Sequence, residues 1–187
     1  MLPEGARRHP FYCEENVFHL CQHPVLGARA RHAVFVSGAL GGCVMWHQRA
    51  ARGPAAPLFW DYHVVVLAED PWEVWDLDST LGCPVSAALY LERSFRPGLP
   101  AELAPIFRVV RAAEMVATLA SDRSHMRGPD GRFQRPPPPW PPVSEPGRGT
   151  NLARFVDMAD PFVGEVLSLA ELSSRVAPEA AEAGRAR

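Results

Sequence analysis

Residues 58–67 read LFWDYHVVVL, and this run of β-branched and aromatic side chains is the strongest β-strand signal in the chain. Glu69, Asp70 and Pro71 follow with side chains typical of turns, and residues 72–78, WEVWDLD, then alternate in the manner of a returning strand. The two runs together predict an antiparallel β-hairpin.

The register of this hairpin depends on the turn. A two-residue turn at Glu69 and Asp70 places His63 directly opposite Asp76 on one face, within hydrogen-bond reach of it. A slip by one residue would send the two side chains to opposite faces. Asp78 is the nearest rival carboxylate, one diagonal step away from His63.

Further elements are expected outside the hairpin. They are a helix over residues 13–22, a strand over 33–36 paired with 44–46, a strand over 107–112, a short helix over 114–120, a helix over 151–158 and a last short element over 166–176. Residues 127–150 are rich in Pro and Gly, with PPPPWPP at 136–142, which predicts a surface loop or a polyproline II segment.

Length and composition fit one globular domain. The chain has 187 residues and a net charge of −2, so it lacks the basic footprint of a nucleic-acid-binding protein. We expect an N-terminal arm over 1–9, a single catalytic domain over 10–176 that contains the loop 127–150, and a disordered tail over 177–187.

Other function classes are excluded or disfavoured by composition. No apolar run reaches the roughly 18 residues of a membrane span, and the N-terminus lacks the apolar core of a secretory signal. The four cysteines are too scattered for a disulfide framework, so we expect thiols in an intracellular protein. Lysine is absent, which excludes chemistry that needs a Schiff-base lysine.

Cys13 stands at the expected start of the first helix. There, free backbone N–H groups and partial positive charge lower the pKa of a thiol and can hold an oxyanion. With His63 to carry the proton and Asp76 to orient it, Cys13 would complete a catalytic triad. Local sequence does not give the distance from Cys13 to the hairpin, so a buried structural cysteine remains the alternative.

A zinc site is a weaker alternative. Its ligands would be Cys13, His19, Cys21 and His23, but their spacing matches no common zinc finger, and Cys13 would face away from His19 on a helix.

Several motifs follow one another in order along the chain: FYCEENV at 11–17, WDYHVV at 60–65, WDLD at 75–78, ASDRSHM at 120–126 and PPPPW at 136–140, followed by weaker signatures at 151–158 and 167–171. Together they resemble the motifs of the protein N-terminal glutamine amidohydrolase family. A set of long motifs in one order is far more specific than any single short motif.

The resemblance implies an α+β fold, an antiparallel sheet with packed helices, and a papain-like or transglutaminase-like cysteine hydrolase core. It carries the catalytic triad onto Cys13, His63 and Asp76, and it places Asp78 outside the triad. This chemistry needs no metal and no organic cofactor.

The implied substrate is a protein or peptide that begins with Gln, whose side chain is deamidated to Glu with release of ammonia through a thioester on Cys13. A site for a chain end must also recognise the free α-ammonium group, for which Glu14, Asp61 and Asp122 are candidates. His125 is a candidate wall or hydrogen-bond donor of the pocket. Each of these side chains also has a purely structural interpretation as a surface or capping residue.

The resemblance further implies a cytosolic enzyme, with the nucleus as a second location, that feeds the N-degron pathway. We expect a monomer that binds neither nucleic acid nor membrane. Two other functions stay open: a transglutaminase-like or papain-like cysteine peptidase, which needs a cleft open on both sides, and a non-catalytic adaptor that presents residues 136–142 to an SH3 or WW domain.

Overall fold

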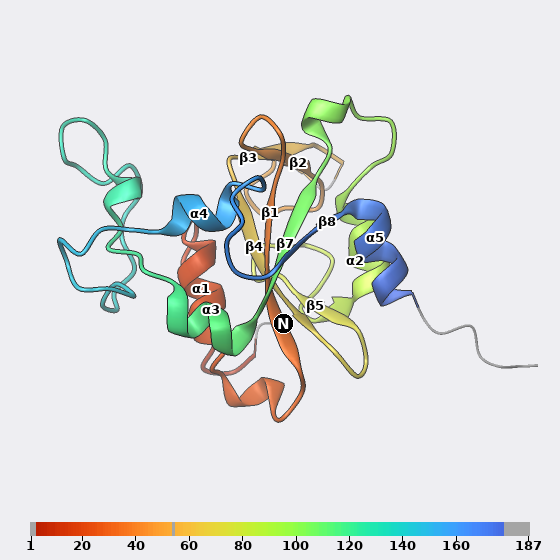
Figure 1. Cartoon of the computed structure of the whole chain (residues 1–187), viewed down its shortest axis with the longest axis horizontal. Coiled ribbons are helices and arrows are strands. Elements are labelled where there is room, and N and C mark those ends of the chain that lie inside the picture. Colours follow the sequence, from red (N-terminus) through yellow and green to blue (C-terminus); the bar gives the residue numbers. More distant parts are fainter. Residues whose placement is uncertain (1–2, 54, 178–187) are drawn as a thin grey trace, which may run out of the picture.

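The computed structural model describes residues 3–53 and 55–177, and it is an α+β fold built on a six-stranded antiparallel sheet (Figure 1). The strands of this sheet, in chain order, are β1 (Arg31–Ser37), β4 (His63–Ala68), β5 (Glu73–Trp75), β6 (Val85–Ser86), β7 (Ile106–Arg111) and β8 (Glu165–Ser168). Their spatial order is β6-β5-β4-β1-β7-β8. A separate two-stranded sheet joins β2 (Cys43–Met45) to β3 (Leu58–Trp60).

Helices cover both faces of the large sheet. They are α1 (Cys13–Leu20), α2 (Ala87–Ser94), α3 (Ala112–Thr118), α4 (Leu152–Val156) and α5 (Leu169–Val176), with short 3-10 turns at Pro24–Leu26, Ala101–Leu103 and Ser124–Met126. Figure 1 shows α1, α3 and α4 on one face and α2 and α5 on the other. The result is three layers, helices on either side of a sheet.

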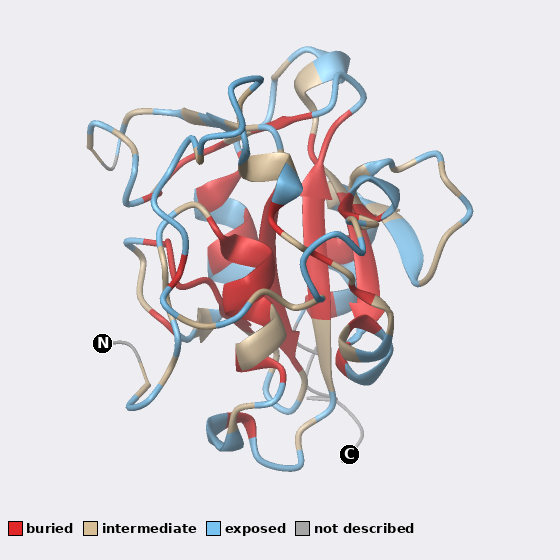
Figure 2. Ribbon diagram, turned by 90° about the vertical axis from the view of Figure 1, so that its left-hand side faces the viewer, coloured by how far each residue is buried: buried red, intermediate tan, exposed pale blue. Residues whose placement is uncertain are grey.

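The central strand β4 explains why the sequence signal over 64–67 was so strong. Its side chains alternate between the two faces: Val64 and Val66 pack with α1, α3 and α4, whereas Val65 and Leu67 pack with α2 and α5. Because both faces are covered, the whole strand is buried, and Figure 2 shows this buried centre.

The expected run 58–67 is not one strand. It divides at Asp61 and Tyr62, so that Leu58–Trp60 forms β3 in the small sheet and β4 begins at His63 in the large one. The expected partner of residues 33–36 was also wrong, since β1 pairs with β4 and β7, and residues 43–45 pair with β3 instead. No local sequence pattern indicates these long-range pairings, and the helix α2 was not predicted.

The hairpin is present, but its predicted register was wrong by two residues. Leu67 lies opposite Val74 instead of Trp72, because the turn spans residues 69–72 and includes Asp70 at φ 50°. Asp tolerates this left-handed conformation better than most residues. A shift by two residues preserves the alternation of faces, so His63 and Asp76 still share one face.

The remaining helices and strands largely follow expectation: α1, β7, α3 and α4 lie within a few residues of their predicted bounds, and the last element is β8 followed by α5. Within 127–150 the structure has no named helix or strand, and an isolated bridge joins Arg127 to Phe133. No helix among the described residues is long and apolar enough to cross a membrane. Of the expected tail 177–187, all but Ala177 lies outside the described residues.

Candidate active site

His63, the first residue of β4, forms a buried pair with Asp76, which directly follows β5. His63 Nε2 donates to Asp76 Oδ1 at 3.0 Å, and each side chain is only 1% exposed. The indole of Trp60 stacks on the His63 ring, with centroids 5.4 Å apart and 14° between the planes. Burial alone would lower the pKa of His63, but the Asp76 charge and hydrogen bond raise it above its ordinary value.

Four donors converge on the Asp76 carboxylate. Besides His63, the backbone N–H of Asp78 donates to Oδ1 at 2.9 Å, while Gln48 Nε2 and the Tyr90 hydroxyl donate to Oδ2 at 3.1 and 2.9 Å. Burial alone would raise the pKa of Asp76, but His63 and these hydrogen bonds bring it below its ordinary value. The carboxylate is therefore ionised and rigidly oriented.

Sequence reasoning missed Gln48 and Tyr90. Gln48 lies between β2 and β3 of the small sheet and Tyr90 lies on α2, so neither is close to Asp76 along the chain. No local sequence pattern predicts these two residues, because their role depends on contacts with Asp76 from distant parts of the chain.

Cys13 is the first residue of α1, as predicted, and is 7% exposed. The backbone N–H of Val64, the residue after His63, forms a hydrogen bond with its side chain. Tyr12 precedes the helix without a side-chain cap, so the first-turn N–H groups are left without a capping acceptor. The sulfur thus lies at an uncapped helix start and in contact with the β4 backbone.

The expected lowering of the Cys13 pKa is not what the structure favours. Burial, and after it the charges of Glu14, Asp78 and Asp76, raise the pKa of this thiol well above its ordinary value, and the Val64 hydrogen bond offsets only part of this. The start of one short helix does not outweigh the burial of the sulfur and the charges of these three carboxylates. Burial and these charges thus favour the thiol form of Cys13 over the thiolate.

A cavity of about 420 Å³ opens at Cys13. Its wall includes Phe11, Trp60, Tyr62, Asp78, His125 and Leu152. Asp78 is held by Arg8, whose Nη2 lies 2.5 Å from Oδ1. The cavity is thus bounded by the α1 start, the hairpin region and the segment 125–153.

Glu14 is fully buried beside the sulfur. Its Oε2 accepts from the Tyr62 hydroxyl at 3.0 Å and lies 3.9 Å from Cys13 Sγ, and its Oε1 lies 3.4 Å from His125 Nε2. Oε1 and both ring nitrogens of His125 have no hydrogen-bond partner. Burial first, and then Glu14, raise the pKa of Tyr62 well above its ordinary value.

The other two predicted binding residues occupy different places. Asp61 is exposed and lines the cavity. Asp122 accepts from the backbone N–H groups of Ser124 and Gly149 and is not part of the cavity wall. The structure thus gives Asp122 the anchoring role that was its alternative interpretation.

A latch that the sequence did not predict joins α1 to the Pro-rich loop. Arg123 forms a two-point ion pair with Glu15, at 2.6 and 2.7 Å, and donates to the carbonyl groups of Pro138 and Trp140. Trp140 Nε1 also donates to Glu15, at 2.9 Å. The Pro-rich segment is therefore engaged by its own chain, an arrangement that disfavours the adaptor function.

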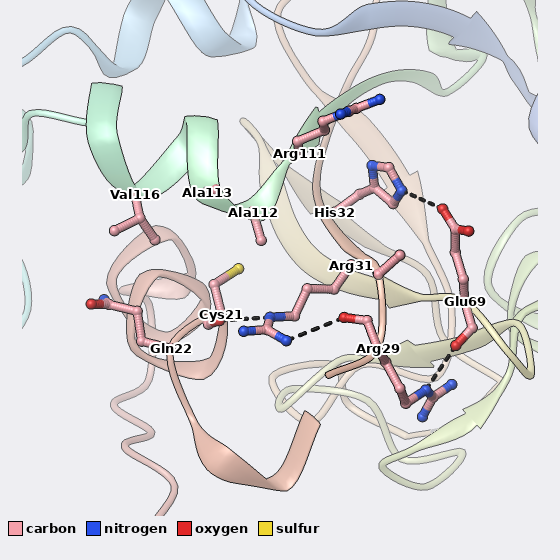
Figure 3. Close-up of a pocket in the computed structure, with 11 residues that line it drawn as sticks. Cys21, Gln22, Arg29, Arg31, His32, Glu69, Arg111, Ala112, Ala113 and Val116 are labelled. Atoms are coloured by element: carbon pink, nitrogen blue, oxygen red, sulfur yellow. Dashed lines mark hydrogen bonds and ion pairs between the residues drawn. The ribbon is translucent and has the colours of Figure 1, made fainter. Parts of the chain in front are cut away.

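A second hollow, of about 610 Å³, lies away from this site beside α3 and the start of β1 (Figure 3). Arg29 and Arg31 line it, but they donate mainly to backbone carbonyls, and His32 pairs with Glu69. It contains none of the predicted catalytic or substrate-binding residues. Within 3–53 and 55–177, no three His, Cys, Asp or Glu side chains gather as a metal site, which removes support for the zinc alternative.

Comparison with known proteins adds an independent result. A family model described as N-terminal glutamine amidase matches residues 8–176. Three proteins, each named protein N-terminal glutamine amidohydrolase, are similar over most of their length. The protein from Arabidopsis thaliana is 37% identical over 80% of this chain and 74% of its own, the one from Homo sapiens 35% over 88% and 84%, and the one from Danio rerio 36% over 86% and 84%.

Proposed function

The chain belongs to the N-terminal glutamine amidase family, and from this premise we propose that it deamidates the side chain of an N-terminal Gln to Glu through a triad of Cys13, His63 and Asp76. It is a hydrolase that acts on an amide. The observation that best supports the triad is the buried His63–Asp76 pair. The residue after His63, Val64, forms a backbone hydrogen bond with Cys13.

Acylation starts with proton transfer. His63 Nε2 is engaged by Asp76, so the buried and unpartnered Nδ1 is the nitrogen free to take the Cys13 proton. The sulfur then attacks the carboxamide carbon, and first-turn N–H groups of α1 stabilise the oxyanion. Protonated His63 returns the proton to the leaving nitrogen, and ammonia departs from a thioester on Cys13.

Deacylation uses the same groups. His63 takes a proton from water as that water attacks the thioester, and then returns a proton to the Cys13 sulfur as Glu is released. Asp76 holds the ring tautomer and stabilises the imidazolium in both halves of the reaction. This chain's own residues supply each proton transfer.

The arrangement also supports the proposal of a papain-like or transglutaminase-like core, in which a cysteine at a helix start packs on a sheet that carries the histidine. The peptidase alternative needs a cleft open on both sides of the sulfur. On one side, the Cys13 cavity is instead closed by residues of the loop 127–150. It adjoins a neighbouring groove, and four residues line both: Asp61, Tyr62, Ala153 and Val156. A chain end in the cavity with the following residues in that groove fits this shape.

The test compares three peptides of one composition: one that begins with Gln, its N-acetylated form, and one with the Gln at an internal position. We expect ammonia release from the first alone. Cys13→Ala should lower this release by at least about 10³-fold, because the nucleophile is lost. Cys21→Ala is the matched control, since burial raises the pKa of Cys21 to about 12 and the residue lies outside the site.

Ammonia release that survives in Cys13→Ala would refute the triad. Equal turnover of the acetylated peptide would refute the N-terminal specificity and favour a transglutaminase-like enzyme. Circular dichroism of each variant establishes that the fold is retained.

The cellular role is a further part of the proposal. An enzyme with this activity would act as a monomer in the cytosol, with the nucleus as a second location, on proteins with N-terminal Gln. The Glu that it forms would feed the N-degron pathway. The family relationship supports the substrate of this proposal, a protein with N-terminal Gln.

A further inference from the structure

Glu14 is a buried carboxylate without a permanently charged partner. It is 0% exposed, its ion-pair neighbour is the imidazole of His125 at 3.4 Å, which is a cation only when protonated, and no arginine among the described residues forms an ion pair with it. Arg123, whose charge also acts on Glu14, gives its hydrogen bonds to Glu15 and to the Pro-rich loop. An ionised carboxylate is costly to bury without a partner, so this position requires a separate explanation.

The carboxylate lies directly behind the cavity wall. Its two oxygens contact Tyr62 and His125, and both of these side chains line the cavity together with Cys13. Neither ring nitrogen of His125 has a hydrogen-bond partner, so this ring can move aside without breaking a hydrogen bond. The unpartnered Oε1 is on this side of Glu14.

The reach of the substrate matches this position. In an N-terminal Gln, four covalent bonds separate the α-nitrogen from the carboxamide carbon, so the two atoms lie at most about 5 Å apart. Attack requires the carbon within roughly 3–3.5 Å of the sulfur. Glu14 Oε2 is 3.9 Å from that sulfur. The Glu14 carboxylate is therefore within reach of the α-ammonium group of a Gln whose carboxamide carbon lies at the sulfur.

We propose that Glu14 binds the α-ammonium group of the substrate, with Tyr62 fixing one of its oxygens and the other left for the ligand, an inference that rests on the proposed function. The site would therefore recognise a primary ammonium group four bonds from a carboxamide. It would reject a neutral group at the same position.

Binding of this cation would also act on the nucleophile. Glu14 is the foremost charge that raises the pKa of the Cys13 thiol, after burial itself. A bound ammonium group neutralises that charge and makes proton loss from the sulfur easier. The correct substrate would thus help to activate the cysteine that attacks it.

The experiment uses the full chain and two peptides that differ in one group. One begins with Gln, and the other begins with a 4-carbamoylbutanoyl group, which lacks only the α-amine. We expect the wild-type protein to prefer the amine-bearing peptide by at least about 100-fold in kcat/KM. Glu14→Gln should reduce this ratio to within about tenfold, mainly through a higher KM for the amine-bearing peptide.

Asp61→Asn is the matched control, because Asp61 is an exposed carboxylate that lines the cavity and was also predicted as an ammonium ligand. It should keep the wild-type ratio. A ratio that persists in Glu14→Gln, or that collapses only in Asp61→Asn, would overturn the inference. Thermal unfolding of each variant separates a loss of recognition from a loss of fold.

The wild-type protein alone also tests the inference, whether or not Glu14→Gln folds. Turnover of the two peptides within threefold of each other would show that no ammonium group is recognised. That outcome would leave deamidation by Cys13 in place. Failure of the wild-type protein to release ammonia from either peptide would refute the proposed function itself.

Discussion

At the residue scale, the site depends on how each charge is compensated. Asp76 is neutralised by His63 and three further donors, whereas Glu14 has a tyrosine and an unbonded histidine ring beside it. The first arrangement is complete in the free protein and orients a base. The second leaves Oε1 of Glu14 without a hydrogen-bond partner, which agrees with the proposed binding of an ammonium group there.

Asp76→Asn tests whether the charge of Asp76, and not only its packing, is needed for the function of His63. The amide fills the same space but loses the charge that raises the pKa of His63, so we expect kcat to fall by about 10²–10⁴-fold. The acid limb of the kcat/KM profile, which reports His63 taking the Cys13 proton, should move to lower pH.

Tyr90→Phe is the milder companion of this variant, because it removes one hydrogen bond to Asp76 and leaves the charge. We expect a loss of about tenfold or less and an acid limb close to that of the wild-type protein. An acid limb that stays in place in Asp76→Asn would contradict the assigned role of the pair.

At the element scale, the latch between α1 and the loop 127–150 shapes the cavity. Glu15 and Arg123 are both buried, and Arg123 also donates to carbonyl groups of this loop, which has no helix or strand of its own. The loop is thus held by a charge pair and by carbonyl contacts, not by secondary structure. Its position depends on α1, the element that also carries Cys13.

Arg123→Met should release this loop. The substitution leaves the Glu15 charge buried without a partner, so we expect the free energy of unfolding to fall by about 3–5 kcal/mol. Cleavage within 127–150 by a trace of chymotrypsin should become faster than in the wild-type protein, and urea denaturation gives the stability change.

Arg132→Met is the control in the same loop, because Arg132 and its partner Asp130 are largely exposed and 3.8 Å apart. It should change stability by no more than about 0.5 kcal/mol. Equal effects of the two substitutions would show that the latch does not hold the loop.

At the scale of the whole molecule, two apolar layers on either side of one sheet position the site. The layer with α1 brings the cysteine to the sheet, and the layer with α2 brings Tyr90 to Asp76. The site is thus assembled where both layers meet the start of β4. Its geometry is coupled to the stability of the whole fold.

The pH dependence of unfolding should show this coupling. The folded pKa of Asp76 is lowered, so its contribution is present above roughly pH 4 and is lost as the pH falls through the folded pKa. The folded pKa of His63 is raised, so its contribution is present below roughly pH 6.5 and is lost as the pH rises through the folded pKa. The pair therefore stabilises the fold most between these two values.

Urea denaturation from pH 3 to 9 measures the effect. The difference in free energy of unfolding between the wild-type protein and Asp76→Asn should be largest between roughly pH 4 and 6.5 and smaller on both sides. Asp130→Asn, a change at an exposed carboxylate, should give a difference within about 0.5 kcal/mol throughout. A pH-independent difference for Asp76→Asn would contradict the assignment of charge to the pair.

The sequence by itself determined the helix that begins at Cys13, the hairpin that carries His63 and Asp76, and the family to which the chain belongs. These features depend on local sequence patterns. Helical and strand periodicity and the order of the motifs do not change when the length of the hairpin turn is predicted incorrectly. The predicted register was wrong by two residues, yet an even shift preserves which face a side chain occupies.

Only the tertiary structure decided what surrounds these residues. Contacts between segments far apart in the chain decide four features: the split between β3 and β4, the donors Gln48 and Tyr90, the latch of Glu15 on Arg123, and the position of Glu14 between Tyr62 and His125. Burial, which sets the pKa of Cys13 against the local expectation, is likewise a property of the packed molecule. A sequence motif identifies the reacting side chains. Their pKa values and their hydrogen-bond partners depend on solvent exclusion and on contacts between distant segments.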